Sequence, residues 1–286
     1  MESHRVIDAH VHFWNPTALH YPWISGMAAL DRTFLPTDLK SLTAGSLDGV
    51  VFVEANCLAS ENVAECEFVD ALAEKESRIV GSVAFVDLCD AQARCRALDA
   101  LAKRERVVGV RHNIQGHPKG FALQPEFVRG VQEVGRNELT FDLCVTADQL
   151  PEITELVRRC PDTKFVLDHC GKPAIRNDAF EPWATDLARL AEHQNVACKL
   201  SGLLTEARPA QRGEEGLFRY ARHAMLCFGA ARLMYGSDWP VVTIAGGEHA
   251  WRALVDAFTS DWTSAGRQAF FFDNVVRFYG LELGSE

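Results

Sequence analysis

Ile7-Asp8-Ala9-His10-Val11-His12-Phe13 joins a short apolar run to two histidines near the start of the chain. The apolar residues that lead into it indicate a buried strand. Residues two apart in a strand point to the same side, so the side chains of His10 and His12 project together. They are either strand histidines that bond to their neighbours or part of a site for one ion or one substrate.

Seven further apolar runs follow, and helical patterns separate them. We expect strands at residues 5–13, 49–55, 79–86, 107–112, 139–145, 164–169, 196–201 and 233–237. We expect helices at residues 36–47, 60–75, 90–104, 125–137, 147–160, 183–192, 216–228, 250–258 and 264–279. Near-continuous apolar strands alternating with helices are typical of a parallel sheet buried on both faces. Eight such strands predict an α/β fold of the (β/α)8 (TIM) barrel class, with a doubly wound open sheet as the alternative.

The N-terminal part contains two candidate helix N-caps and one long irregular segment. Thr37 and Ser60 are plausible N-caps for the helices predicted at 36–47 and 60–75. Residues 14–36 are irregular and rich in aromatic residues and proline. A loop of this length is either functional or a packed surface loop anchored by its aromatics.

Composition restricts the class of protein. The 286 residues, with no linker or repeat, predict one domain over 1–286. Lys plus Arg number 29 against 39 Asp plus Glu, a net charge of −10, and without a basic run the chain is not expected to bind nucleic acid or anionic membranes. Nine scattered cysteines fit reduced thiols in a cytoplasmic protein. We expect neither a signal peptide nor a membrane span.

Titratable and polar residues gather at the C-terminal ends of the predicted strands, which share one mouth of such a barrel. They are His10, His12, Glu54, Arg111, His112, Asp142, His169, Lys199 and Asp238. Each alone has an ordinary explanation: Arg111 as a salt-bridge partner, Lys199 reaching solvent, Asp142 capping a helix. Together they predict a catalytic mouth.

Several motifs, in order along the chain, carry a resemblance to a known family. They are Ile7-Asp-Ala-His-Val-His-Phe-Trp14, Tyr21-Pro-Trp23, Gly109-Val-Arg-His112, Leu167-Asp-His-Cys-Gly-Lys-Pro173, Cys198-Lys-Leu-Ser-Gly202, Tyr235-Gly-Ser-Asp-Trp-Pro240 and the segment 274–281. The histidine pair, the sixth-strand histidine and the aspartate after the eighth strand resemble the amidohydrolase superfamily. The detailed sequences of these motifs are similar to those of one group in that superfamily, which contains the sugar-lactone hydrolases and the pyrone-dicarboxylate lactonases. The resemblance spans nearly the whole chain.

This resemblance implies a hydrolase of carbohydrate metabolism that opens a small-molecule lactone, most simply a sugar lactone like L-fuconolactone. Dinuclear members carry a bridging Lys or Glu on strand four and a histidine on strand five, where this chain has Arg111, His112 and Asp142. A dinuclear centre built on a carboxylated lysine is therefore not expected. One divalent metal, zinc, could be held by His10, His12, Asp238 and His169, or by Glu54 in place of His169. The alternative is a metal-free site whose histidines bind the substrate carbonyl.

The same resemblance suggests residue roles. Asp238 is the expected general base, and His10, His12 and His169 are expected to polarise the lactone carbonyl and stabilise the oxyanion. The expected substrate-binding residues are Arg111, His112, Lys199, Glu54, Asp142, Trp23 and Trp239. The tryptophans, Trp14 included, either stack on the sugar or close the top of the barrel.

Two other functions compete with lactone hydrolysis. One is a metal-dependent non-oxidative decarboxylase of the same superfamily. The sequence of the motif Leu167–Pro173 argues against it, because this motif resembles the lactonases more closely. The other is a non-catalytic sugar-acid-binding barrel, against which the intact histidine pair and Asp238 argue. The sequence leaves the identity of the lactone, its ring size and the oligomeric state open.

Overall fold

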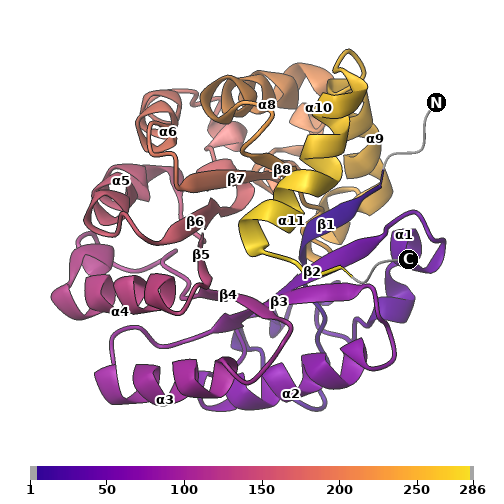
Figure 1. The fold of residues 1–286 in the computed structure, drawn as a ribbon. Coiled ribbons are helices and arrows are strands. Elements are labelled where there is room, and N and C mark those ends of the chain that lie inside the picture. The colour runs from indigo at the N-terminus through magenta and orange to yellow at the C-terminus, as the bar shows by residue number, and fades with distance from the viewer. Residues whose placement is uncertain (1–4, 284–286) are drawn as a thin grey trace.

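Eight parallel strands in chain order form the centre of the computed structural model, which describes residues 5–283. They are β1 (Ile7–Val11), β2 (Gly49–Val53), β3 (Ile79–Phe85), β4 (Val107–Arg111), β5 (Thr140–Leu143), β6 (Lys164–Leu167), β7 (Val196–Leu200) and β8 (Leu233–Tyr235). Each lies inside a predicted apolar run. Figure 1 shows them as a ring surrounded by helices, so the (β/α)8 prediction is confirmed.

The seam between β1 and β8 closes the ring, which is why an open sheet is the wrong alternative. The backbone N–H of Asp238 donates to the carbonyl of His10 at 2.9 Å across this seam. The buried carboxylate of Asp8 accepts from the N–H groups of His10 (3.1 Å) and Ser237 (2.8 Å). A side chain thus satisfies backbone donors at the seam that would otherwise be buried without partners.

The helices surround the ring in Figure 1, apart from the last of them, which lies across the centre of the strands. They are α1 (Lys40–Thr43), α2 (Asn62–Ala73), α3 (Ala91–Leu101), α4 (Pro125–Arg136), α5 (Leu150–Arg159), α6 (Trp183–Ala191), α7 (Leu203–Glu206), α8 (Glu214–Phe228), α9 (Glu248–Phe258), α10 (Ser264–Gln268) and α11 (Asn274–Tyr279). A π-helical turn, Ala269–Asp273, joins the last two. None of these described helices is both long and apolar enough to cross a membrane.

Apolar side chains fill the ring, and α11 covers one end of it. Small and medium residues such as Ala9, Val51 and Val166 form one cluster with Phe278 and Tyr279 of α11. In Figure 1, α11 lies across the centre of the strands. The interior of such a barrel is a packed core rather than a pore. A substrate therefore has to approach from the opposite end, where the strands finish.

The helix predicted at 36–47 is wrong as a single element. It is a 3-10 turn, Pro36–Asp38, followed by the four-residue α1. Leu39 between them is extended (φ −81°, ψ 100°) and fully buried, so packing of this leucine overrides the local helical preference. Thr37 is not an N-cap, since the Asp38 carboxylate accepts the N–H of Leu35 at 2.9 Å instead.

The predicted cap at Ser60 is also wrong. Ser60 lies inside a 3-10 turn, Ala59–Glu61, and α2 begins two residues later at Asn62. The residue that precedes α2 is Glu61, whose side chain makes no capping bond to that helix and instead accepts from His20 at 2.6 Å. The start of α2 is thus fixed by the loop that packs against it.

The irregular residues 14–36 form a packed loop. Trp14 is fully buried, and its indole N–H donates to the carbonyls of Leu30 (3.1 Å) and Arg32 (2.9 Å). The ring of Phe34 lies edge-on to it with centroids 5.3 Å apart. The view of this loop as packed and anchored by its aromatics is therefore confirmed for Trp14.

A buried carboxyl attaches α2 to the end of β2. Glu65 is 2% exposed, and its Oε1 accepts the N–H of Ala55 at 3.1 Å. Burial, reinforced by the charge of Glu54, raises the pKa of Glu65 to about 8. The folded protein therefore keeps this carboxyl protonated at neutral pH.

We predict that Glu65→Gln makes stability less dependent on pH. An unfolded glutamate ionises near pH 4.5 and the folded one near pH 8, so between these values the unfolded state binds fewer protons. The free energy of unfolding of the wild type should therefore fall, relative to Glu65→Gln, by about 1.4 kcal/mol per pH unit as pH rises through this window. Glutamine keeps the acceptor for Ala55. Urea unfolding measured across this pH range gives the difference, and a constant difference would contradict the prediction.

Candidate active site

His10 of β1 and His12, which follows the strand directly, direct their Nε2 atoms at one another. His12 Nδ1 lies 2.7 Å from the carbonyl oxygen of Val53. A carbonyl only accepts, so this nitrogen carries the proton and His12 Nε2 presents a lone pair. His10 Nε2 is 3.1 Å away, and both rings are buried. The prediction that the pair projects together is confirmed.

Two tautomers of His10 fit its surroundings. Its Nδ1 lies 3.1 Å from both Asp168 Oδ1 and Lys199 Nζ. If Nδ1 carries the proton, it donates to Asp168, and two Nε2 lone pairs then face each other. If Nδ1 accepts from Lys199, the proton lies on Nε2 and is donated to His12. Burial lowers the pKa of His10 well below its usual value, so the ring is neutral in either case.

The carboxylate of Asp238 meets the histidines from the loop after β8. Its Oδ1 is 3.6 Å from His12 Nε2, 3.8 Å from His10 Nε2 and 3.9 Å from His169 Nε2. Burial opposes ionisation, but the electrostatic attraction between the carboxylate and the surrounding imidazoles, that of His169 first, outweighs it and lowers the pKa of Asp238 below its usual range. Asp238 therefore carries a negative charge at neutral pH, as a base requires.

His169 is placed by an unusual turn that follows β6. The four consecutive residues from His169 to Lys172 have φ between 47° and 67°, the left-handed region. His169 Nδ1 lies 2.9 Å from the hydroxyl of Ser201. A Cβ at Gly202 would lie 2.7 Å from the imidazole of His169, so only glycine fits beneath the ring. Burial lowers the pKa of His169 to about 4.

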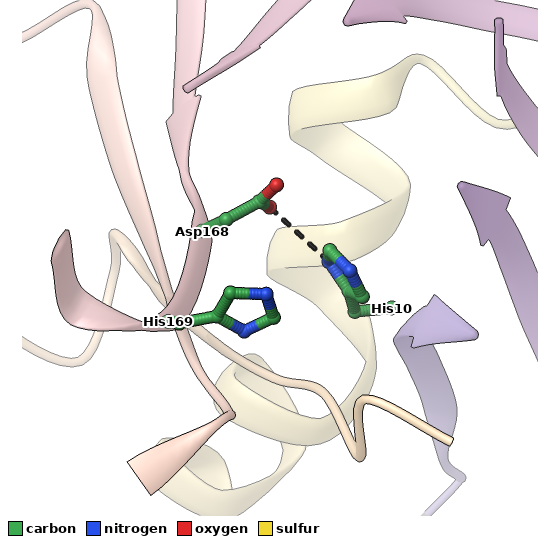
Figure 2. A group of neighbouring side chains, drawn as sticks. All are labelled: His10, Asp168 and His169. Atoms are coloured by element: carbon green, nitrogen blue, oxygen red, sulfur yellow. Dashed lines mark hydrogen bonds and ion pairs between the residues drawn. The ribbon is translucent and has the colours of Figure 1, made fainter. Parts of the chain in front are cut away.

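Figure 2 shows how this turn brings two neighbouring residues to the site: Asp168 points to His10, and the ring of His169 lies beside the same imidazole. The centroids of the rings of His10 and His169 are 4.5 Å apart.

Beneath the histidines lies a fully buried ammonium group. Lys199 Nζ is 2.6 Å from Asp142 Oδ2 and 2.9 Å from Asp168 Oδ1, and all three side chains are 0% exposed. The hydroxyl of Tyr279, from α11, donates to the same Asp142 oxygen at 2.7 Å. Burial opposes the charge on Lys199, but the two carboxylates outweigh it and raise the pKa of the lysine.

A second buried cation extends this network. Arg111 Nε donates to Glu54 Oε1 at 2.6 Å, and its NH1 group donates to Asp168 Oδ2 at 3.2 Å. The other Glu54 oxygen accepts the N–H of Asn56 at 2.7 Å. The four substrate-binding candidates Glu54, Arg111, Asp142 and Lys199 are thus brought together, but below the histidines and bonded to one another.

The remaining substrate-binding candidates lie apart from this cluster. His112 points away, because it follows Arg111 directly: its Nδ1 accepts the N–H of Leu88 at 3.2 Å, and its ring packs among phenylalanine rings. Trp239 is 3% exposed and lies edge-on to Phe34. Trp23 is 36% exposed at the rim, and its N–H donates to a backbone carbonyl.

Among residues 5–283, two groups of donors could hold a metal ion: His10, His12 and Asp238, or His10, Asp168 and His169. Asp168 is already neutralised by the two buried cations, so the first group is the better fit. When His10 Nδ1 carries its proton, two imidazole lone pairs and one carboxylate face a common point. The 3.1 Å between the Nε2 atoms is close to the roughly 3.3 Å edge of a tetrahedral zinc shell.

Sequence reasoning missed two members of the site. Asp168 lies within the motif Leu167–Pro173, from which no role for it is predicted, although it contacts both buried cations and His10. Tyr279 reaches Asp142 across 137 positions of sequence. The position of Asp168 beside His169 was the available signal for the first; no local pattern marks the second.

Comparison with known proteins agrees with this architecture. An L-fucono-1,5-lactonase of Burkholderia multivorans is 35% identical over 96% of both chains, and one of Burkholderia ambifaria is 32% identical over the same shares. A solved amidohydrolase of Burkholderia multivorans, determined once with HEPES and once with zinc, is 33% identical and superposes with a TM-score of 0.87, covering 97% of this chain and 100% of the other.

The amidohydrolase family model matches residues 7–281, a range that begins at the first strand and ends just beyond α11. Every strand of the barrel, the histidine pair and Asp238 fall within it. The chain therefore belongs to the amidohydrolase family.

Proposed function

We propose that this protein hydrolyses a sugar lactone, with Asp238 as the general base. The observation that carries the proposal is the ionised carboxylate of Asp238 facing the Nε2 atoms of three histidines at 3.6–3.9 Å. The named relatives that act on L-fucono-1,5-lactone match 96% of the chain and support the same substrate class.

The reaction joins a water oxygen to the acyl carbon of the lactone. Asp238 accepts a proton from this water, the ring carbon–oxygen bond breaks, and Asp238 returns the proton to the departing ring oxygen. His169 can donate from Nε2 to the carbonyl oxygen when its Nδ1 accepts the hydroxyl of Ser201, 2.9 Å away. Charge developing on that oxygen is stabilised by such a preorganised donor.

The buried cations hold these groups in position. Lys199 and Arg111 fix Asp168, and Asp168 in turn orients the ring of His10. We propose this supporting role for the two cations and for Glu54 and Asp142.

A single zinc ion would be held by His10, His12 and Asp238, with His169 beside them. When bound, it supplies Lewis acidity toward the carbonyl and lowers the pKa of a coordinated water. Asp168 behind His10 and the carbonyl of Val53 behind His12 are the kind of outer hydrogen-bond partners that orient histidine ligands.

The reaction itself is tested with a pH-indicator assay over a panel of lactones. The panel contains L-fucono-1,5-lactone, other aldonolactones and 2-pyrone-4,6-dicarboxylate. Acid release from a sugar lactone supports the proposal. Release of carbon dioxide from an aromatic acid without acid release from any lactone would replace it with a decarboxylase.

We predict that Asp238→Asn keeps the fold and loses lactone hydrolysis by about 10²–10⁴-fold, because the amide has the shape of the carboxylate but cannot accept the proton. The measurement is kcat/KM for the lactone that the panel identifies, with thermal unfolding as the check on folding. Glu206→Gln is the control, since Glu206, the last residue of α7, interacts electrostatically with Asp238 and its replacement leaves the base in place. Near-normal turnover of a folded Asp238→Asn variant would exclude Asp238 as the base.

We also predict one zinc ion per chain after chelation and reconstitution. His12→Ala should weaken zinc affinity at least about 10-fold, because it removes a ligand of fixed tautomer. His112→Ala is the matched control, since this histidine also ends a strand but points away from the cluster. Metal analysis and competition with a chelator measure the affinity. Equal losses in the two variants would argue against the assigned ligands, and a chain that retains no zinc would favour the metal-free site.

A further inference from the structure

The left-handed turn after β6 carries a lysine that the proposed reaction has not yet used. Lys172, partly buried, is its last residue, with φ 47° and ψ 67°. A residue with a side chain is disfavoured in this region, and here His169, Cys170 and Lys172 all adopt it. Such strain persists where the surroundings hold it, often at functional sites.

The surroundings hold this turn firmly. The indole N–H of Trp183 donates to the carbonyl of Cys170 at 2.7 Å, and the N–H of Lys172 donates to the carbonyl of His169 at 2.9 Å. A Cβ at Gly171 would lie 2.9 Å from Leu150. The same turn therefore fixes the backbone positions of His169 and Lys172 together.

The ammonium of Lys172 faces the mouth. Its Nζ donates to the side-chain oxygen of Gln115, an exposed residue that follows β4. Burial opposes its charge, but the fields of Cys144, Asp238 and Glu206 outweigh it and raise the pKa of Lys172. The lysine is therefore charged and within electrostatic reach of the proposed base.

Lys172 differs from the two buried cations in what it is bonded to. Lys199 and Arg111 are held by three carboxylates, those of Glu54, Asp142 and Asp168, so this layer has no positive charge to spare. The partner of Lys172 in this structure is instead a neutral amide. An amide at the surface is readily exchanged for a charged acceptor, and a charge-assisted hydrogen bond is the stronger one.

The proposed chemistry creates a need for such a cation. Ring opening converts a neutral lactone into a carboxylate beside Asp238, and two like charges in a partly buried mouth repel each other. We propose, resting on the lactonase function, that Lys172 is a substrate-binding residue whose ammonium leaves Gln115 to bind the acyl oxygen that becomes the product carboxylate. The ligand class is thus a hydroxy acid with its carboxylate at the Lys172 side of the mouth.

The test compares two ligands that differ in one group. L-fuconate carries the carboxylate, whereas L-fucitol has a neutral CH₂OH in its place. We expect Lys172→Gln to weaken L-fuconate binding about 10–100-fold by calorimetry, the loss of one hydrogen bond to a charged group, and to change L-fucitol binding by less than about 2-fold. Lys172→Arg should restore most of the affinity for L-fuconate.

Two further variants separate the local contact from a general effect of charge or folding. Lys119→Gln removes an exposed positive charge from the loop that carries Gln115 and should leave both affinities unchanged. Gln115→Glu keeps Lys172 but gives it a carboxylate partner, and should weaken L-fuconate binding about 5-fold. Thermal unfolding of every variant checks the fold.

The outcomes distinguish this inference from the proposed function. If the wild type opens a lactone but Lys172→Gln weakens both ligands equally or neither, the inference is overturned and the function stands. The same holds if the wild type opens a lactone but does not bind L-fuconate. If the wild type opens no lactone, the proposed function fails and the inference with it.

Discussion

The structure depends on the burial of one ammonium group, that of Lys199, under the active-site histidines. An ion moved from water into a low-dielectric interior loses about 20 kcal/mol in the idealised limit and several kcal/mol in real proteins. Asp142 and Asp168 offset that cost only if β5, β6 and β7 keep their register, since Asp142 lies in β5, Lys199 in β7 and Asp168 directly after β6. Because the buried ammonium must keep both carboxylate partners, the ion pairs fix the relative positions of these strands. Apolar contacts alone would tolerate small shifts between them.

The same network decides how His10 can be used. Asp168 favours a proton on Nδ1 and therefore a free lone pair on Nε2, whereas Lys199 favours the opposite tautomer. When His10 Nε2 presents a lone pair, the site suits a cation. When His10 Nε2 carries a proton, it donates to His12 Nε2, and the two histidines are then hydrogen-bonded without a cation. The two alternatives drawn from the sequence, a zinc site and a metal-free site, thus correspond to one proton shift within a single arrangement of heavy atoms.

The fold could be predicted because each strand is a near-continuous apolar run, and the mouth because polar residues end those runs. Residues 36–47 could not, since packing rather than periodicity breaks that helix. The side of His112 was predictable in principle: consecutive strand residues point oppositely, and Arg111 points inward. That rule fails at Asp168 and His169, where a left-handed turn brings both neighbours to the site. A positive φ outside glycine has no reliable signal in a single sequence.

The hydrogen bond from Tyr279 to Asp142 spans 137 positions and closes the barrel from below. During synthesis on the ribosome, β1 and the histidine pair emerge long before α11. Until α11 docks, the lower end of the barrel is open to water and Asp142 Oδ2 lacks one of its two partners. Assembly of the catalytic layer is therefore tied to the synthesis of α11, so that a nascent or truncated polypeptide lacking this helix has every proposed catalytic residue but an unfinished interior.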